Sequence, residues 1–226
     1  MATANLSEAD HDRISAAVSA AEGHSAGEIV TILTDRSDGY WDVALAWAAL
    51  VAATALLALS LAPAFYLGLI DRITGAWGNQ WTPGEIFAVA LGVATLKFLA
   101  MLIIQLWQPL KFWLIPPPVK SRRVLGRAIT CFKVGAERRT HGRTGILIYL
   151  SMREHRAEIV ADAAIVGKVA PEVWGEAMAA MLPEIRAGRI ADGMVAAVER
   201  VGVVLAEHFP RAENDTNELP DRLIEV

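Results

Sequence analysis

"TGILIYLSMREHRAEIVADAAI", residues 144–165, contains two apolar runs on either side of the charged turn Arg153-Glu154-His155-Arg156. Each run has the length of a strand, so the stretch predicts a β-hairpin with strands at 146–151 and 158–161. An isolated two-stranded hairpin is only marginally stable in water. The hairpin therefore needs a further strand from elsewhere in the chain.

The best candidate for that strand is "GEIVTILTD", residues 27–35, a β-branched run that ends in polar, turn-forming residues. We predict that residues 28–34 pair with residues 146–151. A basic helix at about 120–140 would lie in the connection, giving a βαβ unit whose crossover tolerates an insertion if its two ends stay close. The fold class is therefore α/β: a layered αβα domain with a small mixed sheet, whose elements are shared between residues 1–40 and 116–210.

The insertion between these parts is strongly apolar. The 226-residue chain is 54% hydrophobic yet still 20% charged, which indicates a membrane region beside an ordinary globular one. Two runs, 43–70 and 86–107, reach the roughly 20 apolar residues that cross a bilayer. We therefore predict a two-helix transmembrane hairpin within residues 41–115.

Tryptophans and basic residues set the expected topology of this hairpin. Six tryptophans mark the ends of the two runs or lie in the loop between them, as an interfacial aromatic belt requires: Trp41, Trp47, Trp77, Trp81, Trp107 and Trp113. The short loop 71–85 carries only Arg72 as a basic residue, whereas many follow the second run. The positive-inside rule then places both termini in the cytoplasm. The first residues lack the apolar core of a signal peptide, so we expect a multi-pass protein of the bacterial inner membrane.

Amphipathic helices complete the predicted domain. Ser7 and Asp10 match a capping box before a short helix that stops near Gly23. Two further helices are expected at about 171–182 and 191–208, covering the sheet. The acidic, proline-broken residues 211–226 are expected to lie over the surface or to be mobile.

The basic residues near the membrane are candidates for contact with anionic lipid, where each charge contributes about 1 kcal/mol. They are Lys111, Lys120, Arg122, Arg123 and Arg127. The partners expected from these features are the lipid bilayer and either another membrane protein or further copies of the chain. A nucleic-acid partner is not expected, because no aromatic residues interleave with the basic ones and the net charge is -4.

Lys97 is the exception within the apolar runs, since a lysine near mid-membrane costs about 2.5 to 3.5 kcal/mol and no acid in either run neutralises it. Its ammonium has three possible environments: the membrane surface, polar neighbours such as Thr95 or Gln105, or a partner subunit. A transport pore is less favoured, because it would need a more polar lining.

These residues carry a resemblance to a known family. "RTGILIYLSMREHRAEIVADAAI", "GEIVTILTD", Trp174 and "HFPRAENDTNELPD" are similar to the TPM domain, and to a bacterial subgroup with a membrane hairpin inserted in that domain. The resemblance implies an αβα fold and a role in the quality or assembly of membrane proteins. Plant members carry a phosphatase assignment with acidic metal-binding positions. The chain departs from the family by Thr144-Gly145 before the second strand and by "ADAAI" in place of a Gly-rich turn.

Candidate catalytic groups are few. No histidine pair has metal-ligand spacing, and Cys131 is the single cysteine. Asp35, Asp38 and Asp162 follow strands and could converge to bind Ca²⁺ or Mg²⁺, although turn-forming aspartates are the favoured interpretation. We therefore favour a membrane-anchored interaction module without a catalytic residue or cofactor. The alternative is a metal-dependent phosphatase that uses these aspartates.

Overall fold

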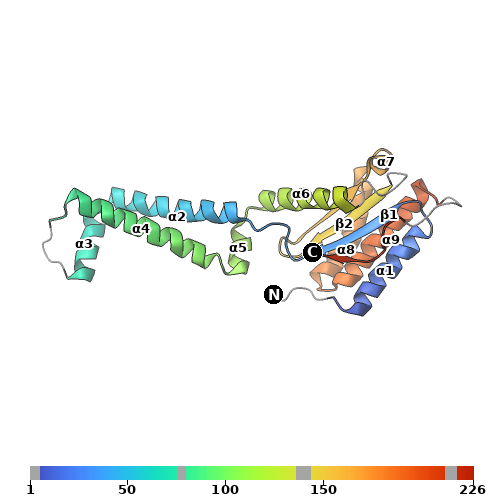
Figure 1. Ribbon diagram of the computed structural model, residues 1–226, viewed down its shortest axis with the longest axis horizontal. Coiled ribbons are helices and arrows are strands. Elements are labelled where there is room, and N and C mark those ends of the chain that lie inside the picture. The colour runs from blue at the N-terminus through green and yellow to red at the C-terminus, as the bar shows by residue number, and fades with distance from the viewer. Residues whose placement is uncertain (1–5, 76–79, 136–143, 212–217) are drawn as a thin grey trace. The chain divides into compact units, whose positions relative to one another are not determined.

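The computed structural model describes residues 6–75, 80–135, 144–211 and 218–226 (Figure 1). The chain divides into two compact units. One combines Met1–Asp38 with Pro117–Val226 and is an α/β domain, and the other, Gly39–Pro116, is helical in its described residues. The expected fold class, an α/β domain with a small mixed sheet that is split by an apolar helical hairpin, is confirmed.

The sheet has four strands in the order β3-β2-β1-β4. β1 (Glu28–Thr34) pairs in parallel with β2 (Gly145–Ser151) along its whole length. This pairing, predicted across the insertion, is confirmed. β3 (Arg156–Ala161) pairs antiparallel with β2 and begins two residues earlier than predicted, because His155 adopts a left-handed φ of 51° that completes a tight turn.

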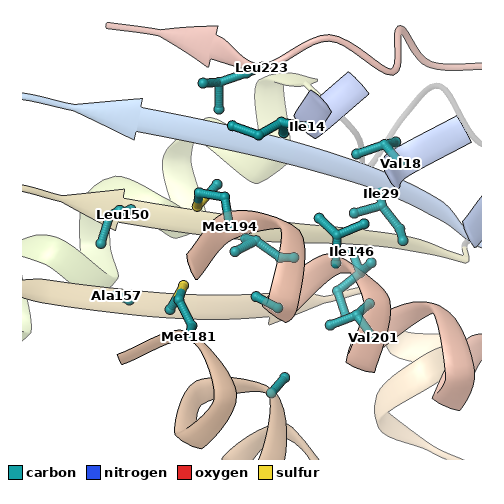
Figure 2. Packing of buried hydrophobic residues seen from close by; sticks show 14 of the residues in the cluster. Ile14, Val18, Ile29, Ile146, Leu150, Ala157, Met181, Met194, Val201 and Leu223 are labelled. Carbon is teal, nitrogen blue, oxygen red and sulfur yellow. The ribbon is translucent and has the colours of Figure 1, made fainter. Parts of the chain in front are cut away.

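One face of the sheet is covered by α1 (Glu8–Glu22), α8 (Pro171–Arg186) and α9 (Ile190–His208), whose apolar side chains form the larger core with β1, β2 and β3 (Figures 1 and 2). The predicted capping box of Ser7 and Asp10 is present at the start of α1. The helix predicted at about 191–208 is present as α9, and its apolar stripe is fully buried at Met194, Val198, Val201 and Leu205.

The other face is covered by α6 (Pro117–Gly135), which places Val124, Ala128 and Phe132 over β1 and β2. Their spacing of four residues lines them up along one side of the helix. The helix expected from about residue 120 begins earlier, at Pro117, because the first helical position needs no N–H and suits the fixed φ of proline.

Residues 224–225 form an edge strand of the sheet instead of lying over its surface. β4 (Ile224–Glu225) pairs in parallel with β1, and Leu219 and Leu223 are buried in the two cores on opposite faces. The Val226 N–H donates to the Leu33 carbonyl at 3.0 Å. The expectation of a surface or mobile tail is therefore wrong for residues 218–226, because these apolar contacts outweigh the polar composition of the segment.

The helical unit contains α2 (Trp41–Leu61), α3 (Pro63–Thr74), α4 (Pro83–Ile104) and α5 (Gln108–Leu114). The run expected as one span over 43–70 is divided at Ala62, because Pro63 cannot donate the helical hydrogen bond that would continue α2. α2 and α4 have 21 and 22 residues and mean hydropathies of 2.2 and 2.3, so both are long and apolar enough to cross a bilayer.

α2 and α4 pack along small residues. Ala44 and Ala48 of α2 are buried, which lets the helix backbones approach closely. The Gln105 Nε2 after α4 donates to the Ala44 carbonyl at 3.1 Å. The Trp47 Nε1 donates to the Leu114 carbonyl at 3.1 Å. These bonds hold one end of the hairpin together.

Candidate functional site at the insertion junction

The carboxyl ends of β1 and β2 lie side by side because the two strands are parallel and in register. Residues 35–38 leave the α/β domain there for the helical unit, and α6 begins the return at Pro117. The β2–β3 turn lies at the same edge. Open α/β sheets commonly place functional residues at this edge, which makes it the candidate site.

Four polar side chains form a hydrogen-bonded cluster at this edge. The Ser37 hydroxyl lies 2.9 Å from Ser151 Oγ and 3.1 Å from the Tyr149 hydroxyl. Glu154 accepts a bond of 2.9 Å from the Ser37 backbone N–H and one of 2.5 Å from Ser151 Oγ. Ser151 and Glu154 are 0% and 3% exposed. We call Ser37, Tyr149, Ser151 and Glu154 the junction cluster.

Burial shapes the electrostatics of this edge. It raises the pKa of the Tyr149 phenol, and the hydrogen bond to Ser37 opposes that shift. Burial also lowers the pKa of Lys120 in α6, which the negative charge of Glu154 opposes. The cluster is therefore a buried polar network that packs against α6, and its buried hydroxyls are poorly placed to meet a substrate.

Two ion pairs flank the cluster. The Arg153 Nε donates to both carboxylate oxygens of Asp35, at 2.9 and 2.8 Å. Arg123 of α6 donates to Asp38 at 2.5 Å. Two of the three predicted metal ligands are thus at the expected edge, but each carboxylate is engaged by an arginine.

The third predicted ligand lies at the opposite end of the sheet. Asp162 follows β3, and its N–H donates to the Gly145 carbonyl at the start of β2. Its Oδ1 accepts from the Ala163 N–H at 2.8 Å and so caps the start of α7 (Ala163–Val166), whereas its buried Oδ2 has no hydrogen-bond partner among the described residues. The structure therefore does not bring Asp162 together with the other two aspartates. Within the described residues, no three His, Cys, Asp or Glu side chains are grouped to hold a metal.

The predicted lipid-contact residues differ in their environments. Lys111 is 7% exposed, lies 4.8 Å from the centre of the Trp41 ring, and donates to the Gly39 carbonyl at 2.6 Å. Because Lys111 is buried, little of its side chain is accessible to lipid. Arg123 is paired with Asp38 and Lys120 is half-buried, whereas Arg122 and Arg127 are exposed.

An acidic cluster at the other end of β1 was not predicted. Glu22 accepts a 2.7 Å bond from the Ile29 N–H, and Glu28 accepts from the N–H groups of Glu218 and Leu219 at 3.3 and 3.1 Å. Burial, together with the charges of Glu28 and Asp221 and a hydrogen bond with Asp221, raises the pKa of Glu22 to about 8 against the opposing bond from Ile29. Glu22 is therefore largely protonated at neutral pH. The hydrogen bonds of Glu28 in this cluster hold residues 218–219 against the start of β1.

Lys97 lies on an open groove between α2 and α4 with a volume of about 410 Å³. Apart from Lys97, the lining is largely apolar and comes from α2: Trp47, Leu50, Val51, Thr54, Ala55 and Ala58. The lysine side chain is exposed. Neither Thr95 nor Gln105, the neighbours considered from the sequence, lines this groove with it.

The fold and the junction define a layered α/β domain interrupted by an apolar helical hairpin. Residues 127–204 match the family model of the TPM domain, the family that the sequence resembles. No curated protein matches the chain. A similar solved structure is the NMR structure of the BA42 protein from the psychrophilic bacterium Bizionia argentinensis. It shares 17% identity, with 98% of this chain and 96% of that chain covered and a TM-score of 0.56. At this identity the likeness concerns the fold alone.

Proposed function

We propose that the chain is a membrane-anchored interaction module, in which the hairpin Gly39–Pro116 holds the TPM domain at the cytoplasmic face of a bacterial inner membrane. There the domain would assist the assembly, maintenance or regulation of another membrane protein. One observation carries the proposal: α4 has no buried residue, and large apolar side chains cover its surface and much of α2. Exposed apolar surface of this extent indicates a lipid or protein environment.

The junction is consistent with this anchoring. Asp38 before the hairpin contacts Arg123 after it, so the chain leaves and re-enters the domain at one place. Two crossings of the bilayer return a chain to the side it left. The charge asymmetry, with Arg72 in the last turn of α3 against the basic residues of α6, favours the cytoplasm for that side.

Reporter fusions test this topology. A reporter fused at Gln80 should behave as exported, and reporters at the N-terminus and after Val226 should behave as cytoplasmic. Alkaline extraction should leave the chain in the membrane fraction. A cytoplasmic signal from the Gln80 fusion, or release of the chain by alkali, would contradict the proposal.

The partner can be sought by cross-linking in native membranes, followed by mass spectrometry. Exposed Arg122 and Arg127 are suitable positions for a photoreactive residue. The same preparation should test whether the partner is a second copy of the chain.

The metal-dependent phosphatase remains the alternative proposal, with Asp35, Asp38 and Asp162 as ligands of Ca²⁺ or Mg²⁺. The separation of Asp162 from the other two, and the arginine partners of Asp35 and Asp38, favour the interaction module. Purified chain should be assayed against phosphomonoesters with either ion. Turnover that is lost in Asp162→Ala and kept in Asp12→Ala, a change at an exposed helical position, would establish the phosphatase instead.

A further inference from the structure

Lys97 places one positive charge in the middle of an apolar groove. The groove lies between α2 and α4, and Lys97 is the only charged residue among the described residues that line it. No described residue forms a hydrogen bond or ion pair with the ammonium group, and the side chain is exposed. An anionic partner stabilises a cation in such surroundings, because hydrocarbon cannot solvate it.

Acids of the hairpin are too distant to be that partner. Glu85 is in the first turn of α4, twelve residues before Lys97, which corresponds to roughly 18 Å of helix. Asp71, near the end of α3, accepts a bond of 3.3 Å from Trp81 Nε1 and therefore lies near that same end of α4. Asp42 is in the first turn of α2. The bond between Gln105 and Ala44 aligns that end of α2 with a point eight residues beyond Lys97, roughly 12 Å away.

Escape of the ammonium group to the membrane surface is also disfavoured. The nearer end of α4 is Ile104, seven residues and roughly 10 Å beyond Lys97. Side chains on a helix leave the backbone toward its N-terminus. The side chain of Lys97 therefore starts toward the middle of the hairpin, away from its nearer surface.

We propose that this groove binds a transmembrane helix of another membrane protein, and that an Asp or Glu on that helix pairs with Lys97. The inference rests on the proposed function, because it requires the hairpin to lie in the bilayer. Charge complementarity selects the occupant. A second copy of the chain would bring a like charge, since neither apolar run carries an acid. Lipid headgroups place their anions at the surface, whereas a helix can carry a carboxylate to the depth of Lys97.

Model helices test the inference with the full chain in phosphatidylcholine vesicles. Leu/Ala transmembrane peptides carry a photoreactive leucine analogue beside a central Glu, Gln or Leu. The Glu peptide should cross-link to Leu50, Val51 or Thr54 several-fold more efficiently than the Leu peptide. Lys97→Leu should remove this preference, and Lys97→Arg should keep it. Ser60→Leu, a change at an exposed position of α2 outside the groove, serves as the control.

Charge reversal keeps the test independent of folding defects. Lys97→Glu should prefer a peptide with a central Lys, which a purely structural role of Lys97 would not produce. Equal yields for the Glu and Leu peptides, or cross-links between two copies of the chain through the groove, would overturn the inference. Co-flotation of the chain with the vesicles is measured in each sample. A chain that does not co-float would overturn the proposed function and this inference together, whereas co-flotation with equal yields would overturn the inference alone.

Discussion

Asp38 and Arg123 form an ion pair although 85 residues separate them in the sequence. Asp38 is the last residue of the α/β domain before the helical unit, and Arg123 lies in the first half of the helix that follows the unit. Ser37 is bound to Glu154 of the β2–β3 turn at the same edge. The segments of the domain before and after the insertion are therefore bonded to each other and to the β2–β3 turn.

The Asp38–Arg123 pair should contribute modestly to stability. Its side chains are 30% and 40% exposed, so solvent screens the attraction. A double-mutant cycle of Asp38→Asn and Arg123→Gln should give a coupling free energy of about 0.5 to 1 kcal/mol. Arg122→Gln, at the adjacent exposed position, should show no coupling with Asp38→Asn. Equal coupling for both arginines would show that net charge, and not the pair, is responsible.

Loss of the Glu154 carboxylate should lower the free energy of unfolding more than loss of the Asp38–Arg123 pair. Glu154→Ala would leave the buried Ser151 hydroxyl and the Ser37 N–H without their acceptor, which costs about 1 to 3 kcal/mol per unsatisfied group. Chemical unfolding should show the loss. Glu176→Ala, a change at an exposed position in α8, should have an effect within about 0.5 kcal/mol. If the two substitutions had the same effect, the junction cluster would have no stabilising role.

Two glycine substitutions should change the stability of the domain in opposite directions. A Cβ at Gly202 of α9 would lie 2.6 Å from the Ala21 Cβ of α1, so Gly202→Ala should force these helices apart and cost about 1 to 3 kcal/mol. A Cβ at Gly175 of α8 meets nothing within 4 Å. Gly175→Ala should therefore stabilise by up to about 1 kcal/mol through helix propensity. Melting temperatures measured side by side should move in opposite directions.

Stability should fall as pH rises through the range set by Glu22. Its pKa of about 8 in the folded chain exceeds the usual 4.5, mainly because of burial and then the nearby Glu28 and Asp221. The folded chain therefore binds a proton that the unfolded chain has lost. This contribution is fully present below pH 4.5 and is lost by about pH 8, with a slope of up to ~1.4 kcal/mol per pH unit.

Glu22→Gln tests this pH dependence. Glutamine keeps an oxygen to accept the Ile29 N–H but cannot ionise. The variant should lose this part of the pH dependence and exceed the wild type in stability above pH 8. Hydrogen exchange at the Ile29 amide would report both effects. An unchanged slope in Glu22→Gln would assign the titration to another group.

The α/β domain should fold without its insertion. A chain in which residues 39–116 are replaced by a short flexible linker keeps the residues of both cores, the junction cluster and the Asp38–Arg123 pair. Circular dichroism and a cooperative unfolding transition should show a folded monomer. Aggregation of this variant, but not of the full chain in detergent, would contradict an independent domain.

The main strand pairing could be predicted because it depends on local patterns. Residues 28–34 and 146–151 are β-branched runs of strand length, and a hairpin at 146–161 needs a third strand. The two-residue β4 carries no such pattern, and its pairing depends on the burial of Leu219 and Leu223. Likewise, hydropathy alone shows one run at 43–70, whereas Pro63 divides it.

The candidate site was only partly predictable. Asp35 and Asp38 lie at the expected edge, but Asp162 does not, because the hairpin makes β3 antiparallel and carries its carboxyl end to the other edge. Glu154 was missed because it lies in a charged turn, where acidic residues are normally exposed. Its burial arises from contacts with Ser37, 117 residues earlier, which no local pattern reports.

The bond between the Val226 N–H and the Leu33 carbonyl joins segments that are synthesised at very different times. β1 is made early, whereas β4 is made only after the hairpin, β2, β3 and the covering helices. Until β4 has left the ribosome, the edge of β1 that it covers is an open template for other strands. The full sheet can therefore form only after the rest of the described domain has been synthesised, even where the hairpin inserts during synthesis.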